Sequence, residues 1–216
     1  LRWGLAHSRN NYSAWIMKQA KQPEAVADFI HNMGILSFID PVYALCVGSF
    51  ESNVYEMVSA YSTFANEGVY NTPIFVTHIE DRQGNLISSF TSSSQDAISK
   101  ESAYTMLTMM QNVITRGTGR RMVWGYDMQG VEIAGKTGTA QQVETRPNHA
   151  LFVGYVPYDN PELSIAIRIA YGYSSHNAAS AARNIFEYYY KEKSLEDILA
   201  LKAAGVNSSS SNSLTD

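Results

Sequence analysis

The stretch that decides the fold lies between residues 131 and 169. It begins Val131-Glu-Ile-Ala-Gly-Lys-Thr-Gly-Thr-Ala140 and ends Leu163-Ser-Ile-Ala-Ile-Arg-Ile169. Apolar residues alternate with small or polar residues in the last segment, which is the pattern of a half-buried strand. Residues 151–156 form another strand candidate, and Pro157-Tyr-Asp-Asn-Pro161 supplies a turn between the two. We therefore predict an antiparallel pair, joined by a third strand over 131–136 into a meander.

Helices are predicted on both sides of this stretch. Apolar residues recur at helical spacing over 54–65 and 103–114, and a glycine follows each segment. Further helices are predicted to begin near Asn10, at Pro23, near Asn177 and at Ser194-x-x-Asp197. Residues 74–79 and 86–90 predict a small β-hairpin. The predicted fold class is α+β, with an antiparallel β-sheet flanked by helices.

Composition limits the classes of function. The 216 residues include 16 Lys and Arg against 20 Asp and Glu, a net charge of −4, so no nucleic-acid partner is expected. Apolar residues make up 45% of the chain, which excludes wholesale disorder. Cys46 lies among apolar neighbours and predicts a buried structural thiol. The five histidines lack ligand spacing, so neither a metal nor a cofactor is expected.

The chain is predicted to divide into three parts. Residues 1–193 form the main domain part, 194–206 a terminal helix, and 207–216 a disordered tail rich in Ser and Asn. No apolar run reaches the roughly 18 residues that a membrane-spanning helix needs. Because the chain begins at Leu1 without an initiating Met, we expect it to be a piece of a longer protein.

Residues 130–137 match the phosphate-loop pattern G-x-x-x-x-G-K-[ST]. A phosphate loop requires a helix from Lys136 and Thr137 onward, because the helix N-terminus completes the anion site. The inner residues have strand character instead, and Gly138 and Pro147 interrupt the segment that should be helical. Nucleotide binding at 130–137 is therefore kept as an unfavoured alternative.

The same segment contains Lys136-Thr-Gly138, the third signature of penicillin-binding proteins and class A β-lactamases. With Arg116-Gly-Thr-Gly119 and Phe152-Val-Gly-Tyr-Val-Pro157, it makes the chain resemble the C-terminal part of a penicillin-binding protein transpeptidase domain. The resemblance runs from Ser8 to about Tyr190. It implies a three-layer, β-lactamase/transpeptidase-like architecture whose N-terminal part is missing from this chain.

The resemblance also implies roles for the strand residues. Lys136 would supply positive potential. Thr137 and Thr139 would hold the terminal carboxylate of a D-alanyl-D-alanine stem peptide or a β-lactam, and the Thr139 amide would form half of the oxyanion hole. Gly138 would let the substrate backbone lie close, because it has no side chain.

The second family signature, Ser-x-Asn, is matched upstream by Ser8-Arg-Asn10. By resemblance, Ser8 would pass a proton between the nucleophile and the departing amine, and Asn10 would hydrogen-bond the penultimate amide of the substrate. Two further matches, at 175–177 and 210–212, are expected to be a helix cap and a tail fragment.

The first family signature, Ser-x-x-Lys, does not occur in these 216 residues. It carries the nucleophilic serine, and the order of the signatures places it before Leu1. The chain alone is therefore expected not to be acylated by penicillin. Residues 54–68 resemble class A penicillin-binding proteins and residues 148–172 resemble class B, so both subclasses stay open.

The resemblance implies a serine D,D-transpeptidase that cross-links peptidoglycan stem peptides through an acyl-enzyme and binds β-lactams. Its expected place is the extracytoplasmic face of the bacterial cell membrane, held by an anchor that this chain lacks. The missing part of the domain would be its partner. A non-catalytic penicillin-binding sensor is the alternative.

Overall fold

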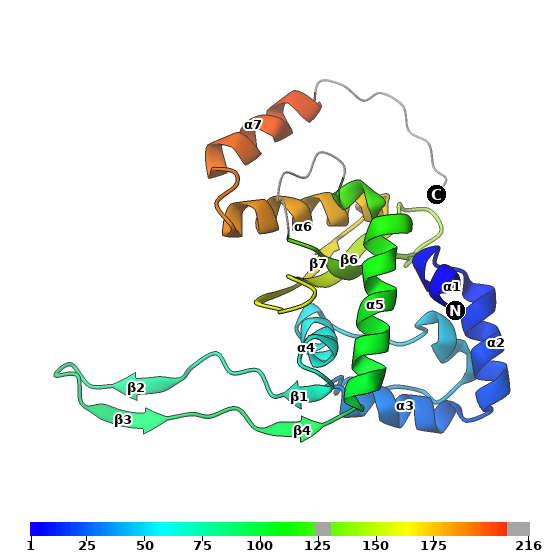
Figure 1. Ribbon diagram of the computed structural model, residues 1–216, viewed down its shortest axis with the longest axis horizontal. Coiled ribbons are helices and arrows are strands. Elements are labelled where there is room, and N and C mark those ends of the chain that lie inside the picture. The colour runs from blue at the N-terminus through cyan, green and yellow to red at the C-terminus, as the bar shows by residue number, and fades with distance from the viewer. Residues whose placement is uncertain (124–130, 207–216) are drawn as a thin grey trace. The chain divides into compact units, whose positions relative to one another are not determined.

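The computed structural model describes residues 1–123 and 131–206. Within them the chain forms two compact units (Figure 1). The sheet unit comprises residues 1–9 and the described residues from 108 onward, and the helical unit comprises residues 10–107. Helix α5 (Lys100–Arg116) contributes to both units. The mixture of helices and antiparallel strands confirms the predicted fold class.

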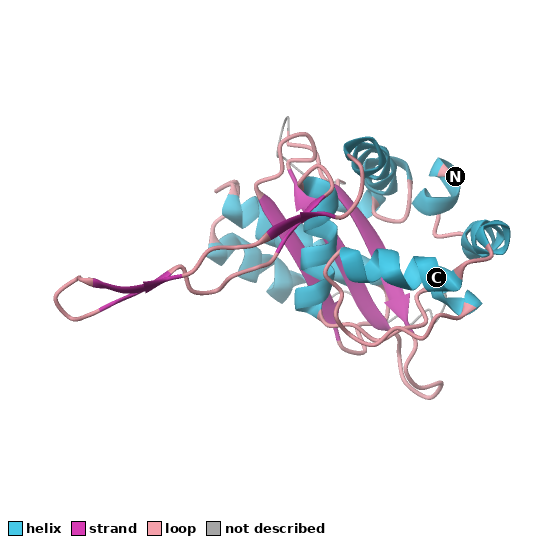
Figure 2. Ribbon diagram, turned by 90° about the horizontal axis from the view of Figure 1, so that it is seen from below, coloured by secondary structure: helices cyan, strands magenta, loops and turns pink. Residues whose placement is uncertain are grey.

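The sheet unit is built on three antiparallel strands in the order β5 (Ala134–Ala140), β6 (His149–Val156) and β7 (Leu163–Ile169) (Figure 2). This meander is the predicted one. The predicted bounds of its first strand were wrong, because pairing with β6 begins at Ala134 and continues until Ala140 lies opposite His149. Among the described strands β5 pairs only with β6, so its other edge has no strand partner.

Helix α6 (Ser175–Tyr189) covers one face of this sheet. Small helix residues, Ala178 and Ala182, allow close packing against Phe152 of β6. Phe186 completes this core, and burying such a side chain is worth about 1.5–3 kcal/mol. The cap of α6 is Ser174, whose hydroxyl accepts a hydrogen bond from the His176 amide. The predicted cap near Asn177 was thus placed too late.

The sheet unit also contains short helices before and after the sheet. They are α1 (Arg2–Ala6), η2 (Arg120–Met122) and α7 (Leu195–Val206). The predicted start of α7 is confirmed, because the Ser194 amide donates to Asp197 Oδ2 at 3.1 Å and the Asp197 amide donates to Ser194 Oγ at 3.2 Å. The tail predicted over 207–216 lies outside the described residues.

The helical unit contains the four segments α2 (Asn10–Ala20), α3 (Pro23–Asn32), η1 (Tyr43–Val47) and α4 (Val54–Ala65). Its core includes Met17, Ala27, Ile35 and Leu45, and Cys46 packs against it half-buried as a free thiol. Two antiparallel pairs follow one another along an extended arm (Figure 1), namely β1 (Val69–Asn71) with β4 (Ser94–Asp96) and β2 (His78–Glu80) with β3 (Leu86–Ser89).

The arm corrects the predicted hairpin. Residues 74–77 lie outside β2, although their apolar character predicted a strand there. The β1 and β4 pair was not predicted, because Ser94-Gln-Asp96 is polar and exposed and carries no apolar alternation.

Candidate active site

Lys136 is positioned by strand β5, where it lies opposite Val153 of β6. Successive side chains of a strand point to opposite faces, so Lys136 and Gly138 lie on one face and Thr137 and Thr139 on the other. The face that carries Thr137 is the one that packs toward α6, since Phe152 lies opposite Thr137 and belongs to the α6 core. Lys136 therefore projects from the face opposite α6.

Ser8 is positioned by the turn that ends α1. Its backbone has a left-handed φ of 50°, its amide donates to Leu5 O at 3.2 Å, and the next amide, of Arg9, donates to Gly4 O at 2.9 Å. The turn around Gly117 supports α1, because the Thr118 amide donates to Ala6 O at 3.0 Å. These backbone bonds fix the point from which the Ser8 side chain leaves the chain.

Lys136 and Ser8, separated by 128 positions in the sequence, meet directly. Lys136 Nζ donates to Ser8 Oγ at 2.5 Å and to the Thr137 carbonyl oxygen at 2.8 Å. Burial lowers the pKa of the Lys136 ammonium from 10.5 to about 8. About a tenth of the side chains are therefore neutral at pH 7, and a neutral Nζ can accept the proton of the Ser8 hydroxyl. The pair can thus move a proton at Ser8 Oγ.

The two threonines of the strand have different surroundings. Thr137 is buried, with 4% of its surface exposed, and its hydroxyl lies 2.5 Å from the hydroxyl of Thr118. Thr139 is exposed near the end of β5. The structure thus brings Thr137 to Thr118 rather than to the Lys136 ammonium, and the carboxylate-binding roles of Thr137 and Thr139 stay predictions.

Gly138 lies on the same face of the sheet as Lys136 and has little free space around it. A Cβ atom at this position would lie 3.2 Å from Leu151 Cβ, so even alanine would require a small adjustment. Asn10 is the exposed first residue of α2 and belongs to the helical unit. The substrate roles of both residues stay predictions.

Thr118 is a site residue that the sequence reasoning missed. Thr118 links α1 to β5. Its amide donates to Ala6 O at the end of α1, and its hydroxyl contacts the Thr137 hydroxyl on β5. The Arg116-Gly-Thr-Gly119 motif was the available signal. Nothing in the motif alone indicates which strand residue its threonine reaches.

The phosphate-loop alternative is wrong. Lys136 and Thr137 lie inside β5, where a phosphate loop needs the first turn of a helix. The described part of 130–137 therefore lacks the helix N-terminus that would bind a phosphate. Gly130 itself lies outside the described residues.

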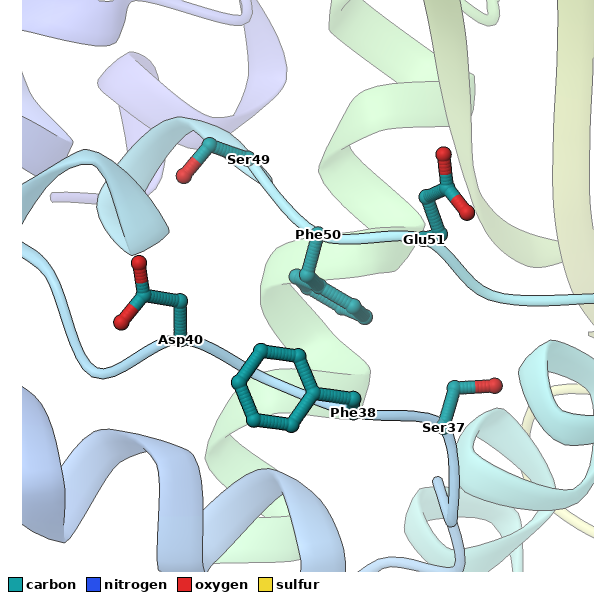
Figure 3. A pocket seen from close by; sticks show the side chains of 6 residues that line it. All are labelled: Ser37, Phe38, Asp40, Ser49, Phe50 and Glu51. Carbon is teal, nitrogen blue, oxygen red and sulfur yellow. The ribbon is translucent and has the colours of Figure 1, made fainter.

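A separate pocket of about 450 Å³ lies in the helical unit (Figure 3). It is lined by Ser37, Phe38, Asp40, Ser49, Phe50 and Glu51. The Phe50 ring points toward Phe38, and the Asp40 carboxylate and Ser49 hydroxyl lie to one side of the two rings (Figure 3). None of the predicted site residues lines this pocket.

Residues 1–123 and 131–206 contain neither a cluster of metal ligands nor a membrane-spanning helix. No three His, Cys, Asp or Glu side chains gather there as metal ligands. No helix in the same ranges is both long and apolar enough to cross a membrane.

Comparison with known proteins identifies the family. The penicillin binding protein transpeptidase domain family matches residues 43–187. Penicillin-binding protein 1A/1B of Bacillus subtilis (strain 168) is 32% identical over 172 residues, which cover 73% of this chain and 18% of that protein.

Solved structures share the fold. The D,D-transpeptidase domain of a peptidoglycan glycosyltransferase from Eggerthella lenta superposes with a TM-score of 0.72 at 22% identity, over 89% of this chain and 53% of that one. Penicillin binding protein 3 from Mycobacterium tuberculosis, complexed with aztreonam, gives 0.75 at 20% identity, over 88% and 51%. The chain thus spans about a fifth of the curated relatives' length and about half of these solved chains. From the extent of the family match, the chain belongs to the penicillin-binding protein transpeptidase domain family, a family of acyl-transferring enzymes.

Proposed function

We propose that this chain supplies the substrate-binding strand and a proton-transferring serine to a serine D,D-transpeptidase. The reaction would join peptidoglycan stem peptides through a serine acyl-enzyme, and β-lactams would acylate the same nucleophile. The place of action would be the extracytoplasmic face of the bacterial cell membrane. The observation that carries the proposal is the 2.5 Å contact between Lys136 Nζ and Ser8 Oγ.

The contact supports proton transfer for a physical reason. An acyl-transfer reaction must remove a proton from the nucleophile and return one to the leaving amine. Ser8 Oγ can relay such a proton, because Lys136 beside it has a pKa of about 8 and changes charge near neutral pH. The free edge of β5 would hold the substrate backbone, with Thr139 and Gly138 next to it.

Covalent labelling with a fluorescent penicillin tests the proposal. The 216-residue chain should show no covalent label, because it contains no Ser-x-x-Lys. A longer protein that includes this chain and an upstream Ser-x-x-Lys should label stoichiometrically. In that protein Ser8→Ala and Lys136→Ala should each slow acylation by about 100-fold or more, the scale of general acid and base catalysis.

The control is Lys18→Ala, which removes an exposed lysine of α2. It should label at the unmodified rate. Unchanged labelling of both Ser8→Ala and Lys136→Ala would refute the proposed roles, and labelling of the isolated chain would refute the expected position of the nucleophile.

A non-catalytic penicillin-binding sensor, which would use the strand with Lys136 for recognition only, is the second candidate. A peptide ending in D-alanyl-D-alanine separates the candidates. A transpeptidase releases D-alanine from this peptide. A sensor binds penicillin but releases no D-alanine from the peptide.

A further inference from the structure

A closed ring of contacts within the sheet unit joins the pair of Lys136 and Ser8 to the turn that follows α5. On one side, Ser8 follows α1, whose last residue, Ala6, accepts a hydrogen bond from the Thr118 amide at 3.0 Å. On the other side, the Thr118 hydroxyl lies 2.5 Å from the hydroxyl of Thr137, the residue after Lys136 in β5. The ring closes where Lys136 Nζ donates to Ser8 Oγ at 2.5 Å. Thr118 is thus linked to Ser8 through α1 and to Lys136 through Thr137.

The turn that carries Thr118 is fixed by its own backbone. The amides of Gly117 and Gly119 both donate to Val113 O, at 3.1 Å and 3.0 Å, and Val113 is fully buried in α5. The turn also lies against α1, because a Cβ atom on Gly117 would come within 2.1 Å of the Ala6 carbonyl oxygen. Thr118 therefore extends from a rigid support.

Thr137 is the residue of β5 that receives this support. It is buried, so its hydroxyl depends on a partner within the protein rather than on bulk water. Among the described strands β5 is paired along one edge only, which leaves a side-chain contact such as this one to help fix its position. A displacement of Thr137 would carry Lys136 with it, because the two residues are adjacent and Lys136 Nζ donates to the Thr137 carbonyl oxygen at 2.8 Å.

Two properties of Lys136 depend on where β5 lies relative to α1. Burial is what lowers the pKa of Lys136 to about 8, so water that entered between β5 and α1 would hydrate the ammonium and raise this pKa. Proton transfer also requires that Nζ stay within hydrogen-bond distance of Ser8 Oγ. A small displacement of β5 would therefore change both the protonation of Lys136 and its reach.

We propose that Thr118 is a positioning residue, which holds Lys136 next to Ser8 through the contact between its hydroxyl and that of Thr137. The consequence for acylation rests on the proposed function, whereas the effect of Thr118 on the protonation of Lys136 does not.

Nuclear magnetic resonance of the 216-residue chain tests the effect on Lys136. The Cε carbon resonance of Lys136 is followed with pH, and Lys136→Met assigns the resonance because it lacks it. Thr118→Val keeps the shape of the side chain and the amide that binds Ala6 O, but it removes the hydroxyl. It should raise the pKa of Lys136, with a gain in proton affinity of about threefold or more, the scale of one hydrogen bond. Thr118→Ser retains a hydroxyl and should keep the unmodified value.

Further variants separate positioning from a general loss of stability. Thr137→Val should raise the pKa of Lys136 by a similar amount, and the double variant with Thr118→Val should add little, because both substitutions remove the same contact. Thr115→Val, at an exposed position of α5 outside the ring, should leave this pKa unchanged. Ala181→Gly destabilises α6 without removing any contact of the ring, and it should also leave the pKa unchanged.

Acylation by a fluorescent penicillin tests the consequence for the reaction, in the longer protein that includes an upstream Ser-x-x-Lys. Thr118→Val should slow acylation about tenfold or more, since a misplacement of about 1 Å can cost about 100-fold. It should also move the acid limb of the pH–rate profile to higher pH. Thr118→Ser and Thr115→Val should keep the unmodified rate and profile. A loss of folded protein alone would lower the labelled fraction at every pH without moving that limb.

Three results would overturn the inference. They are a Lys136 pKa that Thr118→Val leaves unchanged or lowers, an equal rise of this pKa in Ala181→Gly, and an acylation rate and pH profile that Thr118→Val leaves unchanged. A longer protein that fails to acylate even when unmodified would instead remove the proposed function. The resonance of Lys136 in the 216-residue chain would still decide whether Thr118 positions this side chain.

Discussion

Replacing Lys136 with methionine should stabilise the fold while it removes the proposed proton transfer. The folded chain holds this ammonium where burial lowers its pKa from 10.5 to about 8, so protonation of Lys136 costs the folded state free energy. Methionine has a similar length and no charge, and it can occupy the same half-buried position. The Ser8 hydroxyl that loses its donor is exposed and can be hydrated.

The expected size follows from the two pKa values. The difference between 10.5 and about 8 corresponds to about 3 kcal/mol at roughly 1.4 kcal/mol per tenfold change. Solvent screening around a half-buried ammonium reduces this value, so we expect Lys136→Met to gain about 2 kcal/mol. For a chain of this length that gain raises Tm by about 4–8 °C.

The sign of the pH dependence is fixed by the direction of the pKa change. Below pH 8 Lys136 is protonated in both the folded and the unfolded chain, so the full free-energy cost of burying its charge lowers the stability. Between pH 8 and 10.5 the folded state releases the proton first, so the unmodified chain gains stability relative to the variant. The advantage of Lys136→Met should therefore be constant from pH 6 to 8 and should shrink above pH 8.

Urea unfolding of both chains at half-unit steps from pH 6 to 10 measures this difference directly. Other groups titrate identically in both chains and cancel in the comparison. Lys18→Met, at an exposed position of α2, is the matched control and should leave both the stability and its pH dependence unchanged. A Lys136→Met chain that is less stable than the unmodified chain at pH 7, or an advantage that persists unchanged at pH 10, would refute the reasoning.

Three further substitutions test other parts of the structure. Burial alone would raise the pKa of Glu56, but hydrogen bonds from Ser37, Asn53 and Ser52 lower it to about 2. Glu56→Gln should therefore lower the free energy of unfolding by about 2–3 kcal/mol at pH 7. In urea unfolding, the difference between this variant and the unmodified chain should shrink as the pH falls from 4.5 toward 2. Gly117→Ala would place a Cβ 2.1 Å from the Ala6 carbonyl oxygen, so it should displace α1 and lower Tm, whereas an unchanged Tm would contradict this contact. Thr118→Val removes the partner of the buried Thr137 hydroxyl and should cost about 1–3 kcal/mol in the same urea assay, with Thr118→Ser retaining most of the stability.

The sheet could be predicted because its information is local. Alternation over 163–169 and the turn at 157–161 specify an antiparallel pair, and the structure has that pair in the expected order. The bounds of β5 could not be predicted in the same way. Gly135 and Gly138 have weak strand propensity, and only the partner β6 makes the run from Ala134 to Ala140 a strand.

The arm of the helical unit illustrates the opposite case. A strand was predicted over the apolar residues Ile74, Phe75 and Val76. All three are exposed and belong to no strand. Ser94-Gln-Asp96 has the composition of a loop and nevertheless pairs with β1. Backbone pairing and polar side-chain hydrogen bonds, such as that between Thr72 and Ser93, hold this pair, so no alternation of apolar residues signals it.

The chemistry of the candidate site was predictable by residue, whereas its geometry was not. Lys136 and Ser8 were recognisable from short motifs, but their meeting depends on Gly117 and Thr118, which hold α1 from a third part of the chain. Each contact is individually modest, since one hydrogen bond contributes about 1 kcal/mol. Lys136, in turn, costs stability through its buried charge. A site of this kind persists because the core beneath it, where Phe152 and Phe186 are fully buried, stabilises the strand regardless of the lysine. The pKa that suits proton transfer and the loss of stability then have one physical cause, the removal of water from the Lys136 ammonium.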